Sequence, residues 1–383
     1  MRRISSRPTG LWCVIAGVLI YFAVLSGAAA GAADTVRVLL AEGRPAVTVA
    51  SAGRLTLTDV SGRRILAQRM SGTFRLTPQR GAVAVRETGM FASGLIAWPA
   101  DGAVLTLDGQ PFRGQLYVQV LNGGLVVINV VELEDYLQGV LKDEIPPGWP
   151  GEAAKAVAVA ARTYAVYQRL QNPDALFHLR ATTASQVYGG ARGEDARTNW
   201  AVQTTRGQIL TFGGQPLPAF YHSCSGGATE DATDVFGLEY DIIPGVKDDF
   251  SLGCPYVLWI ERLTPQQIEG GLAAAGYRVG RVQAVQDLIR SRTGRILQVE
   301  VRHTLGTLVL EGKRFREAIG NDVLRSTDFQ VRADGNAFTF VGRGSGHGVG
   351  LSQWGAKEMA DLAFQYHEIL KFYYPLAAIG TLR

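Results

Sequence analysis

The sequence predicts an α+β protein with a β-rich N-terminal domain, a mixed helical and β core, and a small α+β insertion within that core. Three observations predict this fold. Residues 34–125 contain short β-rich runs, separated by turn residues, at intervals of roughly ten residues. Two helical patterns follow between Val131 and Leu170. Residues 263–320 then show helices and strands of their own, which indicates a separate small unit inside residues 126–383.

The first 33 residues have the composition of a secretory signal peptide. Arg2, Arg3 and Arg7 precede an apolar run from Leu11 to Leu25, and the small residues of SGAAAGAA follow. The apolar stretch also reaches the length of about 20 residues that a membrane anchor needs, so an uncleaved anchor remains an alternative. In either case we expect the remaining chain to be exported, to the periplasm, the cell envelope or the extracellular space.

The charge of the chain argues against a nucleic-acid partner. The formal net charge is +4, and it falls to +1 when Arg2, Arg3 and Arg7 are removed with the signal peptide. No basic stripe remains that would neutralise phosphates. With 47% hydrophobic and 19% charged residues, the chain can bury a large core.

Residues 34–125 are expected to form antiparallel strands. They contain no cluster of titratable residues, which favours an accessory wall or a partner-binding face. The β-rich runs are TVRVLLAEG, AVTVASAG, RLTLTDVSG, FRLTPQRG, AVLTLDGQ and GQLYVQVLNGG.

The first helix is expected in VELEDYLQGVLKDEI. Pro146 and Pro147 end it, and Pro150 suits the first residue of a second, Ala- and Val-rich helix that runs to Leu170 and is expected to be buried. One face of the first helix is apolar, at positions i, i+3, i+4, i+7 and i+8; these residues are Leu133, Tyr136, Leu137, Val140 and Leu141.

Glu144 is placed where its pKa should rise. It follows the last turn of the first helix, where the helix dipole disfavours negative charge, and it precedes apolar, rigid residues. A carboxyl group that stays protonated near neutral pH is suited to protonate a glycosidic oxygen. The alternative is an ordinary solvated glutamate at a helix end.

Lys155 and Arg162 are seven residues apart, so they lie on one side of the second helix. Cations on a buried helix need anionic partners or a wet cleft. Glu152 can supply one partner, which gives a structural ion-pair network. The functional alternative is a cationic lining that orients Glu144 or a substrate.

The stretch GRGSGHGVGLSQWGA, residues 342–356, combines glycines with polar side chains. Glycines let the backbone approach a ligand closely, and His347, Ser352 and Gln353 offer hydrogen bonds. Trp354 offers a face on which a sugar can stack. A tight structural turn is the alternative, and the strand and helix context of a nucleotide-binding loop is missing.

Two cysteines remain after the signal peptide, Cys224 and Cys254. In an oxidising compartment they suit a disulfide. Free thiols are a second alternative. A third is a structural zinc ion held by His222 and both cysteines, although the sequence shows no fourth ligand.

Several ordered motifs resemble the SpoIID/LytB family, the group of sporulation stage II protein D. They spread over about two-thirds of the chain, and Ile145 stands where the family has Met in its Glu-Met-Pro motif. The motifs are VELEDYLQGVLKDEIPPGWPGEAAKAVAVAARTYAV, TTASQVYGG, FYHSCSGGATE, RSTDF, GRGSGHGVGLSQWGAKEMA and YHEILKFYYP.

The resemblance implies a peptidoglycan lytic transglycosylase that leaves a 1,6-anhydro sugar and needs no cofactor, with Glu144 as the catalytic acid. It implies glycan strands, stripped of stem peptides, as the substrate. It leaves a structural zinc open, because some family members bind zinc near the stretch that holds Cys224. The residues expected to bind the substrate are Lys155, Arg162, Tyr188, His222, Ser223, His347, Ser352 and Gln353.

A second function comes from a different class. The LytB name implies a glycan-binding module that stimulates a cell-wall amidase without catalysis. The presence of Glu144 favours the enzyme, whereas the β-rich N-terminal region is compatible with both functions.

Overall fold

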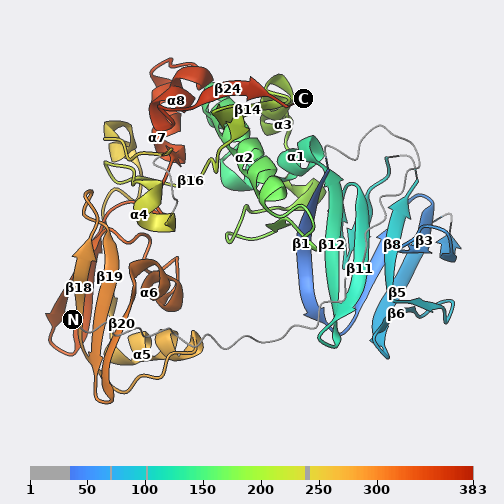
Figure 1. Cartoon of the computed structure of the whole chain (residues 1–383), viewed down its shortest axis with the longest axis horizontal. Coiled ribbons are helices and arrows are strands. Elements are labelled where there is room, and N and C mark those ends of the chain that lie inside the picture. The colour runs from blue at the N-terminus through green and yellow to red at the C-terminus, as the bar shows by residue number, and fades with distance from the viewer. Residues whose placement is uncertain (1–34, 70, 101, 238–241, 383) are drawn as a thin grey trace, which may run out of the picture.

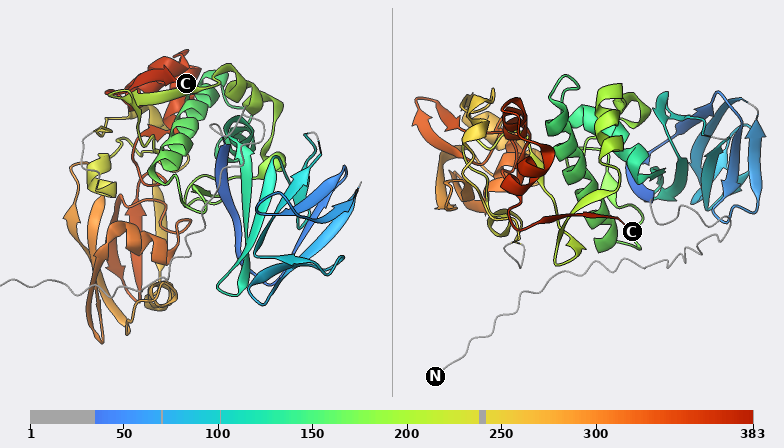
Figure 2. Two further views of the ribbon diagram at one scale, coloured as in Figure 1. Left: turned by 45° about the vertical axis from the view of Figure 1, so that its right-hand side comes forward. Right: turned by 90° about the horizontal axis from the view of Figure 1, so that it is seen from above.

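The computed structural model describes residues 35–69, 71–100, 102–237 and 242–382. It has the α+β architecture that the sequence predicts, in three parts (Figure 1). A β-sandwich and a smaller α+β unit lie on opposite sides of a helical core, and the same order is visible in Figure 2. The expected signal peptide lies outside the described residues. Within the described ranges, no helix is long and apolar enough to cross a membrane.

Two sheets form the N-terminal β-sandwich, in the strand orders β13-β1-β12-β11-β8-β3-β4 and β10-β9-β2-β5-β6-β7. Each of the six β-rich runs contains a strand. Alternate side chains, such as Val47 and Val49 of β2, are buried between the sheets. The strands are β1 (Thr35–Arg44), β2 (Val47–Ser51), β3 (Leu55–Asp59), β4 (Ile65–Arg69), β5 (Gly72–Gln79), β6 (Ala82–Val85), β7 (Phe91–Ala92), β8 (Gly94–Pro99), β9 (Leu105–Leu107), β10 (Gln110–Phe112), β11 (Gln115–Leu121), β12 (Gly124–Glu132) and β13 (Leu179–Arg180).

Strand β12 joins the sandwich to the helical core. It pairs with β1 and β11 and continues without a loop into helix α1 (Leu133–Glu144). The β-rich region therefore extends to Glu132, beyond the expected boundary at residue 125, because β12 is an inner strand of the seven-stranded sheet. This connection fixes the direction of α1, and hence the position of Glu144 at its C-terminal end.

Helix α2 (Gly151–Gln171) is the centre of the core. Most of its Ala and Val residues are buried, as expected, and their small side chains allow neighbouring helices to pack closely. The apolar face predicted for α1 is buried at all five positions. The other core elements are η2 (Gly190–Gly193), α3 (Ala196–Thr204), β14 (Gln208–Phe212), β15 (Gln215–Pro216), α4 (Ala232–Phe236), η3 (Asp249–Gly253), α7 (Gln353–Asp361), α8 (Tyr366–Tyr373) and β24 (Ala378–Thr381).

A two-stranded parallel sheet brings two distant motifs together. Strand β16 (Tyr221–His222) pairs with β23 (Leu351–Ser352), so the segment FYHSC lies beside the segment GVGLSQ. The φ angle of Gly350 is +69°, and a Cβ at this position would collide with the carbonyl oxygen of Phe220. Glycine is therefore needed for this close approach.

The inserted unit is larger than the expected residues 263–320. Strand β17 (Trp259–Leu263) pairs with β22 (Ala337–Gly342), and this pairing joins the two ends of the unit. The unit has its own apolar core, around Phe315, Phe329 and Phe340. Its other elements are α5 (Pro265–Ala274), β18 (Val282–Arg290), β19 (Ile296–His303), β20 (Gly306–Glu311), α6 (Gly312–Ile319) and β21 (Phe329–Asp334).

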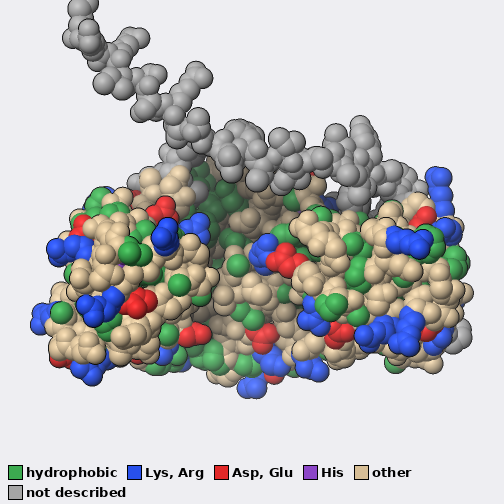
Figure 3. All heavy atoms as spheres, turned by 90° about the horizontal axis from the view of Figure 1, so that it is seen from below, with side chains coloured by type: hydrophobic (Ala, Val, Ile, Leu, Met, Phe, Trp, Pro, Cys, Tyr) green, Lys and Arg blue, Asp and Glu red, His purple; other side chains and the backbone are tan. Residues whose placement is uncertain are grey.

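The surface carries charges of both signs. In Figure 3, Lys and Arg side chains are interspersed with Asp and Glu side chains on the face seen from below, and the inserted unit and the sandwich stand on either side of a hollow. On this face, therefore, no continuous basic surface is present that would attract the phosphate backbone of a nucleic acid.

Candidate active site

A cavity of about 1150 Å³ lies between the helical core and the inserted unit. Its core side is lined by residues from the end of α1, from α2, from the segment before Tyr188, from β16 and α4, and from the glycine-rich loop. Its other side is lined by residues of the inserted unit, among them Arg295, Lys313 and Arg316. The sequence-predicted site residues that line it are Glu144, His222, Ser223, His347 and Gln353.

Glu144 is the last residue of α1, as expected, and two donors hold its carboxyl group. Its Oε1 accepts the backbone N–H of Val187 at 3.0 Å, and its Oε2 accepts Nε2 of Gln353 at 3.1 Å. Tyr221 lies beside Glu144 in the cavity wall, and its hydroxyl also acts as a donor that lowers the pKa of Glu144. Burial raises the pKa of Glu144, and these donors oppose part of this rise. The pKa of Glu144 therefore shifts in the expected direction, and burial is the main cause.

The motif TTASQVYGG supplies the donor from Val187. The backbone N–H of Gly189 donates to Gly139 of α1 at 3.0 Å, which holds this segment against the helix. A Cβ at Gly139 would lie 2.6 Å from the ring of Tyr188, so only glycine allows the contact. Tyr188 itself is buried and donates to Asn129 at 2.8 Å. It does not line the cavity, so its expected role in substrate binding stays a prediction that this cavity does not support.

His222 and His347 lie side by side in the cavity wall, with ring centroids 5.5 Å apart. Nδ1 of His222 lies 3.1 Å from the carbonyl oxygen of Val349, which can only accept, so Nδ1 carries the hydrogen. Nδ1 of His347 accepts the N–H of Val349 at 3.0 Å. The same residue of the glycine-rich loop therefore fixes the orientation of both rings.

Both imidazoles are neutral over the usual pH range. Burial, with a contribution from the charges of Arg316 and Arg295, lowers the pKa of His347 to about 3. Burial likewise lowers the pKa of His222, and His347 and Arg295 add to the effect. These residues can give hydrogen bonds to a bound ligand, but they supply no positive charge.

Ser352, Ser223 and Gln353 have different roles. Ser352 is fully buried, accepts the N–H of Gly355 as the N-cap of α7, and lies 2.7 Å from the hydroxyl of Ser251. It does not line the cavity, so its expected contact with substrate stays a prediction that this cavity does not support. Ser223 and Gln353 do line it, and Gln353 places its amide on Glu144.

Lys155 and Arg162 do not line the cavity, so the ion-pair alternative holds for both. Nζ of Lys155 lies 2.6 Å from Glu152, the partner expected from the sequence, and 4.9 Å from the ring centre of Trp200. Arg162 has no exposed surface, and its guanidinium donates to both oxygens of Glu134 at 2.9 Å. Both cations are thus held in ion pairs, and their expected role in binding the substrate stays a prediction that this cavity does not support.

Cys224 and Cys254 form a disulfide. Both sulfur atoms are therefore occupied, and the zinc site made of His222, Cys224 and Cys254 is corrected in favour of the disulfide alternative. In the described part of the chain, no group of three or more His, Cys, Asp or Glu side chains is arranged to hold a metal ion.

Two features of the site escaped the sequence analysis. Tyr221 and Gln186 stand within the motifs FYHSCSGGATE and TTASQVYGG, so their positions carried a signal. Their residue types alone did not indicate that Tyr221 lies beside Glu144 or that Gln186 is hydrogen-bonded to Tyr221. The inserted unit supplies a whole wall of the cavity, and no motif in residues 263–320 indicated this.

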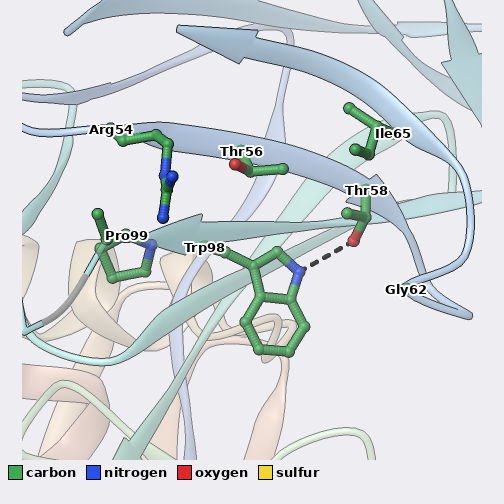
Figure 4. A pocket seen from close by; sticks show the side chains of 8 residues that line it. Arg54, Thr56, Thr58, Gly62, Ile65, Trp98 and Pro99 are labelled. Carbon is green, nitrogen blue, oxygen red and sulfur yellow. Dashed lines mark hydrogen bonds between the residues drawn. The ribbon is translucent and has the colours of Figure 1, made fainter. Parts of the chain in front are cut away.

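A smaller hollow of about 330 Å³ lies on the sandwich (Figure 4). It is lined by residues of β3, β4, β8 and their turns, and the indole N–H of Trp98 donates to Thr58 at 2.9 Å. Arg54 is the one titratable residue in its lining, so it has no pair of groups for acid–base or metal chemistry. The cavity at Glu144 is therefore the candidate active site.

Comparisons with known proteins agree with this choice. A family model described as stage II sporulation protein (SpoIID) matches residues 121–212, which include Glu144, and a domain of unknown function (DUF8618) matches residues 257–350. An uncharacterized protein of Brachyspira hyodysenteriae is 32% identical over 311 residues, which cover 81% of this chain and 83% of the relative.

Two relatives carry informative names. Stage II sporulation protein D of Bacillus amyloliquefaciens is 30% identical over 316 residues, which cover 77% of this chain and 86% of the relative. The amidase enhancer of Bacillus subtilis is 30% identical over 62% of this chain, but only 39% of that relative is covered.

Proposed function

The chain belongs to the SpoIID family, and on that premise we propose that it is an exported lytic transglycosylase that cleaves the MurNAc–GlcNAc bonds of peptidoglycan. The observation that carries the proposal is the state of Glu144. Its carboxyl group lies in the wall of a large cavity, burial raises its pKa, and fixed donors hold it in place. A raised pKa and a fixed position are properties that a general acid needs.

In the proposed reaction, protonated Glu144 gives its proton to the glycosidic oxygen while the bond from that oxygen to C1 of MurNAc breaks. The GlcNAc hydroxyl leaves. The carboxylate then removes the proton of the C6 hydroxyl of MurNAc, and O6 forms a bond to C1. The products are a 1,6-anhydro-MurNAc end and a GlcNAc end, and Glu144 is protonated again. No water and no external reactant are consumed.

The proposed reaction needs only one acid. Ordinary glycosidases place a second carboxyl group across the scissile bond. The lining of the cavity contains further carboxyl groups, those of Asp234, Glu311, Glu317 and Asp322, but the carboxylate whose charge acts on the pKa of Glu144 is that of its exposed neighbour Asp143. Ring closure by the C6 hydroxyl needs no second carboxylate, so Glu144 can supply both proton transfers, and the products of the digestion distinguish a transglycosylase from a hydrolase.

The rest of the cavity suits a polar polymer. His222, His347 and Gln353 offer neutral hydrogen-bonding groups beside Glu144, and the inserted unit forms the opposite wall. Export, expected from the first 33 residues, would bring this cavity to the cell wall. Glycan strands, stripped of their stem peptides, are the substrate that the family resemblance implies.

The likeness to an amidase enhancer favours a second candidate function. In this alternative the cavity binds glycan without cleaving it, and the protein stimulates a cell-wall amidase. Both candidates place the protein in cell-wall metabolism, and they differ in whether Glu144 transfers a proton.

The test is digestion of stripped and of intact peptidoglycan with the mature protein, followed by mass spectrometry of the soluble products. We expect 1,6-anhydro products from the wild type and a loss of roughly 10²- to 10⁴-fold in Glu144→Gln, which keeps the shape of the side chain but cannot transfer the proton. Asp143→Asn is the matched control, because it removes the adjacent exposed carboxylate, and it should retain activity.

Other products would decide against the proposal. Reducing ends in place of anhydro ends would identify a hydrolase. Retained binding of glycan without any product, in the wild type as in Glu144→Gln, would favour the amidase-stimulating alternative.

A further inference from the structure

Hydrogen bonds link three side chains near Glu144, those of Tyr136, Gln186 and Tyr221. The hydroxyl of Tyr136 lies 3.0 Å from Oε1 of Gln186, and Nε2 of Gln186 lies 2.9 Å from the hydroxyl oxygen of Tyr221. Tyr221 and Glu144 both line the cavity, and donation by the Tyr221 hydroxyl opposes the rise in the pKa of Glu144. The three linked side chains come from α1, from the segment before Tyr188 and from β16, so these hydrogen bonds join three separate parts of the core.

The direction of each hydrogen bond follows from a single carbonyl group. Gln186 also lies 3.2 Å from the carbonyl oxygen of Ala161, which can only accept. The atom that faces Ala161 must therefore be the amide nitrogen. Its two hydrogens are directed to Ala161 and to Tyr221, and its oxygen faces Tyr136.

This assignment leaves one orientation for the hydroxyl of Tyr221. Because its oxygen accepts the hydrogen from Gln186, its own hydrogen is free to point at Glu144. Tyr136 donates to the amide oxygen and thereby holds the amide from the other side. Burial raises the pKa of both tyrosines far above their ordinary value, with a contribution from the charge of Glu144, so both remain protonated donors.

We propose that Tyr221 is a positioning residue for Glu144, and that Gln186 and Tyr136 fix its hydroxyl hydrogen on the carboxyl group. This inference rests on the proposed function, and it deepens it. When Glu144 has given its proton to the leaving oxygen, the carboxylate stays in a buried cavity. A donor already aimed at it stabilises this charge without rearrangement, and so lowers the barrier to proton transfer.

The direct test is the titration of Glu144 by NMR in protein labelled with ¹³C at the glutamate carboxyl, with Glu144→Gln to assign the signal. In Tyr221→Phe we expect the pKa of Glu144 to rise, because a hydrogen bond to the charged form is lost. Gln186→Leu should change it in the same direction, since Tyr221 then loses its fixed orientation. The rate of glycan cleavage by Tyr221→Phe should fall roughly ten- to hundredfold.

Tyr374→Phe is the matched control. The hydroxyl of Tyr374 is also buried, accepts the N–H of Leu351 at 3.3 Å and donates to the carbonyl of Phe220 at 2.6 Å, but it does not contact Glu144. This variant should leave the titration of Glu144 unchanged.

The two proposals fail in different ways. An unchanged titration of Glu144 in both Tyr221→Phe and Gln186→Leu, in protein with native circular dichroism, overturns the positioning role even if the rate falls. An equal rise in Tyr374→Phe also overturns it, because the effect would then be general. A wild-type protein that releases no anhydro sugar would refute the proposed reaction, while the titration would still decide the role of Tyr221.

Discussion

Replacement of Arg162 with methionine is expected to lower the free energy of unfolding by about 3–5 kcal/mol, the usual effect of removing one partner of a buried ion pair. The side chain has no exposed surface, and it donates to both carboxylate oxygens of Glu134 at 2.9 Å. It also donates to the carbonyl groups of Val202 and Gln208 at 3.0 and 3.2 Å. Methionine fills much of the same volume, so the main loss is the charge left unpaired on Glu134.

A double variant separates this charge effect from packing. Glu134→Leu combined with Arg162→Met removes both charges, and replacement of a buried ion pair by apolar residues is often close to neutral. The double variant should therefore be more stable than Arg162→Met alone. Its recovery will be incomplete, because the carbonyl groups of Val202 and Gln208 still lack their donor.

The assay is chemical denaturation followed by far-UV circular dichroism, together with glycan cleavage measured on the folded fraction. We expect the midpoint to fall and the cleavage rate per folded molecule to stay within a few-fold of the wild type. An unchanged midpoint with cleavage abolished would refute the structural role, and it would restore the contact with substrate that the family resemblance implies for Arg162.

Three further predictions concern the site and its support. Gln353→Leu removes a donor from the charged form of Glu144, so its pKa should rise further; because cleavage needs protonated Glu144, the alkaline limb of the pH–rate profile should move to higher pH. Reduction of the Cys224–Cys254 disulfide, which closes a separation of 30 residues, should lower stability by about 3–4 kcal/mol in urea denaturation, whereas a zinc chelator should have no effect. His347 binds a proton in the unfolded chain near its ordinary pKa but in the folded chain only near about 3. Its contribution to stability should therefore be lost as the pH falls below about 6.5, and His347→Gln should show a weaker loss on acidification.

Local sequence rules predicted the elements that carry Glu144. The spacing of apolar residues in α1 and the prolines after it placed the helix end correctly, because both depend on neighbours within a few positions. The prediction of a raised pKa was also correct in direction. Burial dominates the shift, and the apolar residues around Glu144 already indicated burial.

Contacts between distant residues were not predictable in this way. The partner of Arg162 is Glu134, 28 positions earlier, and nothing in the spacing of α2 indicates it. Gln353 meets Glu144 across 209 positions. The boundaries of the inserted unit were missed for the same reason, since β17 and β22 pair from its opposite ends.

The two donors to Glu144 come from segments that are synthesised at different times. Val187 follows Glu144 by 43 positions, but Gln353 follows it by 209 positions and is therefore synthesised much later. A chain still emerging from the ribosome, or only partly through a membrane, contains Glu144 without the amide that holds it and without the glycine-rich wall of the cavity. The surroundings of Glu144 are therefore complete only after both distant segments have been synthesised and have folded together, so any function that depends on this carboxyl group has to wait for that step.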